Sequence, residues 1–223
     1  MKNSDAVDTI ENGKYFAQIV TDDSSDSPRD WDNLGTMVCF HNRYNLGDLG
    51  KRGCVGKEDN FFWGIEDFNE WVKENKNNIS VMLPLFLYDH SGISMSTGQE
   101  YPFNDMWDSG QVGWIFVTKE DVKKEFLCKI VSAKMKEKVT KILRQEVETY
   151  NDFLTGNVYG YQLYRLDLDE DMELEDSDDP EDFGEEIDSC YGYYGLDYLK
   201  SEVKEMIEWH MAKDIENCVA ENI

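Results

Sequence analysis

The chain has 223 residues, of which 40% are hydrophobic and 13% aromatic, so it can bury a sizeable core without disulfide bonds. Its 47 Asp and Glu against 22 Lys and Arg give a formal net charge of -25. That charge excludes general affinity for a phosphate backbone and disfavours anionic membrane surfaces. Five irregularly spaced cysteines, with no signal peptide, predict free thiols in a reducing cytoplasm.

Along the first half of the chain we expect a loose N-terminus (residues 1–13), two strands (14–21 and 36–41), a helix (65–77) and two buried central strands (81–88 and 112–117). The helix follows from Ile65, Phe68 and Trp71, which share one side at helical spacing. The central strands are short apolar runs, rich in β-branched and aromatic residues and bounded by turn residues.

The second half predicts two helices (residues 119–126 and 132–154), a strand (157–168), an acidic segment (167–188) and a last helix (196–215). Thr118 stands where an N-cap residue belongs, and Gly156 stands where a C-cap glycine belongs. Strands in adjacent pairs with helices between them indicate an α+β fold. We therefore expect a single domain over residues 1–223, in which a mixed or antiparallel sheet is covered by helices.

The best candidates for acid–base chemistry lie in polar turns at strand ends. Histidine is the side chain that most often serves as an acid or base in enzymes, and Asp89 or Asp108 could orient the ring of His90. His41, at the end of an earlier strand, is the fourth candidate. Such turn residues also bond nearby backbone groups, so a purely structural role stays open. If the loops that carry these residues and Trp31 meet in one pocket, that pocket could bind a metal or a nucleotide. The protein would then be a hydrolase.

Signals for a bound metal are weak. Cys39, His41, Cys54 and His90 lack the paired spacing that is typical of zinc ligands. Residues 22–33 lack the Gly and the Glu that a calcium-binding EF-hand loop needs at its sixth and twelfth positions. No metal and no cofactor is therefore predicted.

The acidic segment is the least ordinary feature, since residues 167–188 contain 14 Asp or Glu and no Lys or Arg. Such a run is usually solvated, but the interleaved Leu166, Leu168 and Met172 indicate that part of it continues the preceding strand. A row of ordered carboxylates would resemble the phosphates of a nucleic acid and could fill a basic groove. The partner-binding candidates are Asp167, Asp169, Glu170, Asp171, Glu173, Glu175, Asp176, Asp178, Asp179, Glu181 and Asp182.

Four segments of the chain carry a family resemblance: DSPRDWDNLGTM (residues 26–37), LPLFLYDHSG (83–92), WDSGQVG (107–113) and CYGYYG (190–195). Through them the chain resembles a poorly characterised family of accessory proteins carried by phages and conjugative elements of bacteria. The resemblance implies a genomic context in which inhibitors of CRISPR and restriction systems are common. It implies a counter-defence protein that inhibits a host nuclease, such as Cas9 or a restriction enzyme. The net charge, rather than the resemblance, predicts that the protein binds neither nucleic acid nor a membrane directly.

Overall fold

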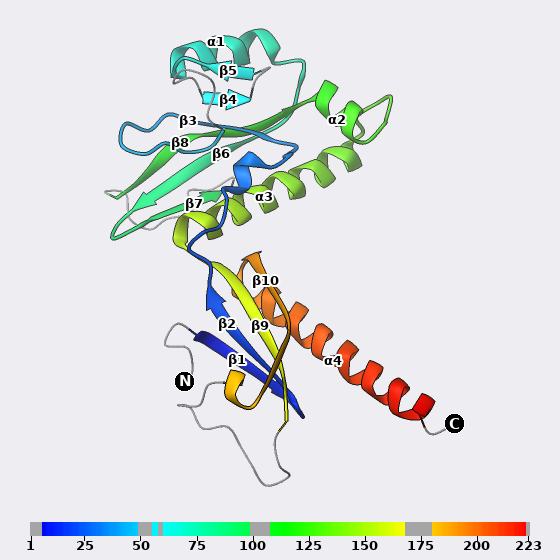
Figure 1. The fold of residues 1–223 in the computed structure, drawn as a ribbon. Coiled ribbons are helices and arrows are strands. Elements are labelled where there is room, and N and C mark those ends of the chain that lie inside the picture. The colour runs from blue at the N-terminus through cyan, green and yellow to red at the C-terminus, as the bar shows by residue number, and fades with distance from the viewer. Residues whose placement is uncertain (1–5, 49–54, 58–59, 99–107, 168–179, 222–223) are drawn as a thin grey trace. The chain divides into compact units, whose positions relative to one another are not determined.

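The computed structural model describes residues 6–48, 55–57, 60–98, 108–167 and 180–221 (Figure 1). The chain divides into two compact units: unit 1 comprises Met1–Asp26 and Gly156–Ile223, and unit 2 comprises Ser27–Thr155. Within the described residues, each unit has its own four-stranded antiparallel sheet and its own main core. The α+β class with antiparallel sheets is therefore confirmed, whereas the assignment of residues 1–223 to one domain stays a prediction.

Unit 2 is built around a sheet with the strand order β3-β8-β6-β7, in which all neighbours are antiparallel. Its elements are η1 (Pro28–Asp30), β3 (Thr36–Cys39), β4 (Val55–Lys57), β5 (Asn60–Phe62), α1 (Ile65–Asn75), β6 (Ile79–Asp89), β7 (Ile93–Thr97), β8 (Ser109–Thr118), α2 (Lys119–Glu125) and α3 (Ala133–Thr155).

Both faces of the unit 2 sheet are covered. On one face, strand residues such as Leu85 and Ile115 pack against the buried stripe of α3. On the other face, Phe116 packs with Phe68 of α1 and Phe62 of β5. With both faces filled, polar side chains that could meet a ligand are confined to the ends of the strands. The buried stripe of α3 has helical spacing and consists of Val139, Leu143, Val147 and Tyr150.

Unit 1 has the strand order β1-β2-β9-β10, again with antiparallel neighbours throughout. One face of this sheet packs against α4, whose Leu199, Val203 and Ile207 are fully buried. The elements are β1 (Ala6–Asn12), β2 (Tyr15–Thr21), β9 (Val158–Leu166), η3 (Pro180–Asp182), β10 (Gly184–Tyr194) and α4 (Leu196–Glu221).

The predicted strands and helices all appear, with shifted ends. Thr118 is the N-cap of α2 as predicted: its hydroxyl accepts from the Asp121 N–H at 3.2 Å, and the Asp121 carboxylate accepts in return. Strand β9 ends at Leu166, and the predicted extension to Leu168 lies outside the described residues. Over the described residues, no helix combines the length and apolar composition needed to cross a membrane.

Two predictions are corrected. Residues 6–12 of the expected loose N-terminus form β1, an edge strand held mainly by its backbone pairing with β2. Residues 184–188 of the acidic segment form the first half of β10, which pairs with β9. Three short strands, β4, β5 and β7, were not predicted, because they are too brief for a clear alternation of apolar and polar residues.

Candidate functional site

The predicted acid–base residues meet at one edge of the unit 2 sheet. His41 follows β3, Asp89 ends β6, and Asp108 precedes β8. Since β8 lies between β3 and β6 and runs antiparallel to both, these three positions share the same end of the sheet. The backbone N–H of Asp89 donates to the carbonyl oxygen of Asp108 at 2.8 Å, which fixes the two turns against each other.

His90 and Asp108 form a direct pair. The distance from His90 Nδ1 to Asp108 Oδ2 is 2.9 Å. An ionised carboxylate only accepts, so Nδ1 of the neutral ring carries the proton and Nε2 keeps a free lone pair. Both side chains are exposed, His90 by 62% and Asp108 by 39%. The pair therefore presents a potential general base, His90 Nε2, to solvent.

His41 is held in the opposite tautomer. Its Nδ1 accepts the backbone N–H groups of Arg43 and Tyr44, each at 3.2 Å, so its Nε2 carries the proton when the ring is neutral. The ring stacks on Tyr44 with 5.1 Å between centroids, and the Tyr44 hydroxyl donates to Asp89 at 3.0 Å. His41 thus caps a turn through Nδ1, and its Nε2 also offers one donor.

A pocket of about 300 Å³ joins these residues. His41, Asp89 and Asp108 all line it, whereas His90 is connected to it through Asp108. Trp31, which the hydrolase interpretation placed at the same pocket, is not part of this lining and is half exposed on its own loop. The remaining lining residues are Phe40, Leu87, Ser109, Gly110, Gln111 and Val112.

The zinc interpretation gains no support from the described part of the chain. Among those residues, no group of three or more His, Cys, Asp or Glu is arranged to hold a metal ion. Cys39 is buried in the unit 2 core, and burial, with the nearby charge of Asp48, raises the pKa of its thiol to about 12. It is therefore a neutral thiol at physiological pH. Cys54 lies outside the described residues.

The second candidate site, the acidic segment, begins and ends on the β9–β10 hairpin of unit 1. Asp167 follows β9, and its backbone N–H donates to the carbonyl oxygen of Phe183 at 2.7 Å. Asp182, at the end of η3, is exposed like Asp167. The predicted residues Asp169, Glu170, Asp171, Glu173, Glu175, Asp176, Asp178 and Asp179 lie outside the described residues, as does the side chain of Glu181.

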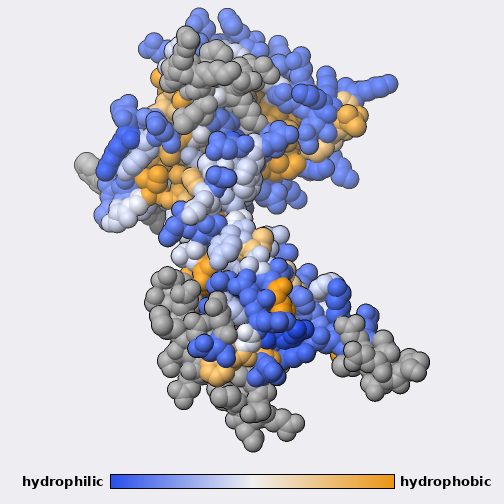
Figure 2. All heavy atoms as spheres, in the orientation of Figure 1, coloured by the Kyte–Doolittle hydropathy of each residue, from blue (hydrophilic) through white to orange (hydrophobic). Residues whose placement is uncertain are grey.

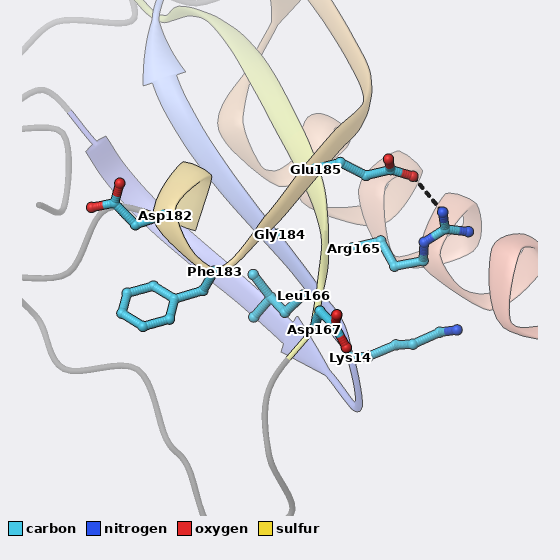
Figure 3. Close-up of a pocket in the computed structure, with 8 residues that line it drawn as sticks. All are labelled: Lys14, Arg165, Leu166, Asp167, Asp182, Phe183, Gly184 and Glu185. Carbon is cyan, nitrogen blue, oxygen red and sulfur yellow. Dashed lines mark hydrogen bonds and ion pairs between the residues drawn. The ribbon is translucent and has the colours of Figure 1, made fainter.

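A cavity of about 620 Å³ lies at the base of this segment (Figure 3). Lys14 and Arg165 point to one side of the strands, while Asp182 and Phe183 point to the other. Both cations are already neutralised, since Lys14 pairs with Asp214 at 2.7 Å and Arg165 pairs with Glu185. The cavity is lined by Lys14, Arg165, Leu166, Asp167, Asp182, Phe183, Gly184 and Glu185.

The acidic residues of β10 were not among the predicted site residues. Glu186 is exposed, whereas Glu185 pairs with Arg165 and Asp188 accepts the Tyr161 hydroxyl at 2.9 Å. Two irregularities in the β9–β10 register hide the alternation that would have revealed this strand. Because β10 is an edge strand, its charges also protect the sheet from pairing with other chains.

The negative charge of the chain is concentrated in unit 1. That unit carries 27 Asp and Glu but only six Lys and Arg, a formal net charge of -21. Unit 2 carries 20 Asp and Glu against 16 Lys and Arg, a formal net charge of -4. Comparison of the chain with models of protein families, with curated proteins and with solved structures finds no match.

Proposed function

We propose that the protein is a counter-defence protein of a mobile genetic element. It acts in the cytoplasm of a bacterial host, where unit 1 binds the basic nucleic-acid groove of a defence nuclease and inhibits it. The nuclease is a CRISPR effector such as Cas9 or a restriction enzyme. The observation that carries the proposal is the charge of unit 1, which has 27 acidic against six basic residues.

The chemistry of such a groove explains why concentrated charge matters. Enzymes of this kind hold nucleic acid in positively charged channels and contact mainly its backbone. Carboxylates do not reproduce base edges, but they can replace phosphates in ion pairs with Lys and Arg. In unit 1 the described base of the acidic segment is tied to a sheet by the Asp167–Phe183 hydrogen bond, and its nearest cations are already paired. Little positive charge is left there to compete with that of a partner.

Charge reversal tests the proposal. Exchanging six acids of the segment for Lys should abolish both binding to the nuclease and its inhibition. The matched control exchanges six exposed acids of unit 2 and should leave inhibition intact; inhibition that survives the first exchange would contradict the proposal. The test positions are Asp169, Glu170, Asp171, Glu173, Glu175 and Asp176, and the control positions are Glu66, Glu70, Glu74, Glu120, Glu125 and Glu137.

A metal- or nucleotide-binding hydrolase is the second candidate, favoured by the His90–Asp108 contact beside the pocket. His90 Nε2 would accept a proton from an attacking water, and His41 Nε2–H would donate to the substrate. A screen of purified protein on nucleotides and nucleic acids, with elemental analysis, tests this role. Turnover that falls by roughly 10²-fold or more in His90→Gln would support it, and absence of turnover would count against it.

A further inference from the structure

The connection between α2 and α3 exposes two large aliphatic side chains. Leu127 is 92% exposed and Ile130 is 79% exposed, the highest values among the described large hydrophobic residues. Figure 2 shows hydrophobic atoms bordered by hydrophilic ones in the region of this connection. Single exposed apolar residues are ordinary, but two in one short connection make it a candidate contact surface.

The backbone at Leu127 is also unusual. Helix α2 ends at Glu125 with Phe126 as its C-cap residue. The N–H of Cys128 donates to the carbonyl oxygen of Lys123 at 3.2 Å, which forms a Schellman-type C-cap. Leu127 occupies the left-handed position of this cap, with a φ of 48°. Glycine is the usual residue there, because a side chain strains the backbone. A leucine that gains no burial at a strained position does not serve the stability of the fold.

Exposed lysines surround the connection. Among the described residues, none of these lysines forms an ion pair with another residue. Two of them, Lys134 and Lys136, lie in the first turns of α3, where positive charge opposes the helix dipole and no acid is present in the first turn. The exposed lysines are Lys123, Lys124, Lys129, Lys134, Lys136 and Lys138. They outnumber the exposed acids beside them, which are Glu120, Glu125 and Glu137.

We propose that the α2–α3 connection docks on an anionic lipid bilayer. Leu127 and Ile130 enter the boundary between headgroups and acyl chains, and the lysines lie at the anionic headgroups. Aliphatic residues ringed by lysines are typical of segments that bind a membrane surface. Protein interfaces are instead enriched in aromatic residues and Arg and depleted in Lys, which argues against a protein partner here.

The net charge of -25 predicts repulsion between the whole chain and an anionic membrane. The uneven distribution of that charge along the chain removes this expectation for the α2–α3 connection. Unit 1 carries most of the excess acid, and unit 2 is close to neutral. Lysines near a lipid surface act over roughly 8 Å at physiological ionic strength, so local charge decides their contribution. This inference concerns unit 2 and is independent of the function proposed for unit 1.

Co-sedimentation of the full chain with lipid vesicles tests the inference. Vesicles of equal parts phosphatidylcholine and phosphatidylglycerol should bind the protein, and vesicles of phosphatidylcholine alone should not. The double variant Leu127→Gly/Ile130→Ser should bind the anionic vesicles about tenfold more weakly or worse. The variant Lys123→Glu/Lys124→Glu/Lys129→Glu should not bind them at all.

Matched controls use the exposed residues of α1. Ile65→Ser and Lys73→Glu/Lys76→Glu should retain the affinity of the unaltered chain, since Ile65 is 47% exposed and both lysines are exposed. Absence of binding to anionic vesicles would overturn the inference. So would binding that the Leu127→Gly/Ile130→Ser variant retains in full, or a result in which these residues capture an acidic protein while vesicles stay unbound.

Discussion

The buried guanidinium of Arg29 donates two hydrogen bonds to the carboxylate of Asp48, from Nε at 2.7 Å and from Nη2 at 3.1 Å. Its Nη1 also pairs with Glu146 of α3 at 3.1 Å, and its side chain is 2% exposed. Burial alone would lower the pKa of Arg29, but the hydrogen bond to Asp48 and the two carboxylate charges outweigh it, and the pKa lies above its ordinary value. The network ties the loop at η1 to the core of unit 2.

Removing one member of this network should be costly. In Asp48→Asn the buried guanidinium loses its main counter-charge, and we expect a loss of about 3–5 kcal/mol in the free energy of unfolding. Urea unfolding at neutral pH measures it. The control Asp30→Asn, at an exposed position of η1, should change stability by less than about 0.5 kcal/mol. Equal stability of the two variants would show that the buried network contributes little.

Two glycines of β8 should differ in their tolerance of alanine. A Cβ at Gly113 would stand 1.9 Å from the carbonyl oxygen of Val38 on the neighbouring strand β3. Gly113→Ala should therefore push the strands apart and destabilise the protein by roughly 2–3 kcal/mol. A Cβ at Gly110 meets nothing within 4 Å, so Gly110→Ala should be nearly neutral. Thermal unfolding of both variants distinguishes a close approach from a general sensitivity of the strand.

Elements with a strong local pattern were predictable from the sequence. The stripe of α3 and the apolar runs of β6 and β8 each bury one regular set of side chains. Strand β10 was not predictable, because its acids and register irregularities conceal it. Pairing was not predictable either: β2 joins β9, with Tyr15 opposite Arg165, and no local signal links segments so far apart.

The candidate site was partly predictable from the sequence, whereas the buried Arg29 network was not. Asp89, His90 and Asp108 follow predicted strand ends, so their proximity could be anticipated from a shared sheet edge. The contact between Arg29 and Glu146 joins residues 117 positions apart, and each looks like an ordinary surface charge in the sequence. Burial of a charge depends on tertiary packing and leaves no mark in a local pattern.

Cys39 should make stability fall at alkaline pH. Its pKa is raised from 9.0 to about 12, so between these values the unfolded chain loses a proton that the folded chain retains. The free energy of unfolding should then decrease by about 1.4 kcal/mol per pH unit through this thiol, and below pH 9 the effect should vanish. Comparison with Cys39→Ala separates the contribution of this thiol to the pH dependence of stability from the contribution of the tyrosine side chains. The two proteins would have parallel pH profiles if the thiol titrated normally.

Replacing Leu127 by glycine should stabilise the fold. The left-handed backbone strain is relieved and no buried contact is lost, so we expect a gain of up to about 1 kcal/mol in the free energy of unfolding. Gly156, which has a φ of 73° and open space around it, provides the reverse comparison: Gly156→Ala should lose about 1 kcal/mol. A Leu127→Gly variant less stable than the unaltered chain would mean that the leucine supports the fold.

Competition between the protein and nucleic acid for one nuclease tests the central claim most directly. Guide-loaded Cas9 is titrated with labelled target DNA at increasing concentrations of the protein. If unit 1 occupies the basic groove, the apparent Kd for DNA rises in proportion to the protein concentration, and added salt weakens the competition steeply. A Kd that does not change, or a complex in which the nuclease holds DNA and the protein together, would contradict the claim.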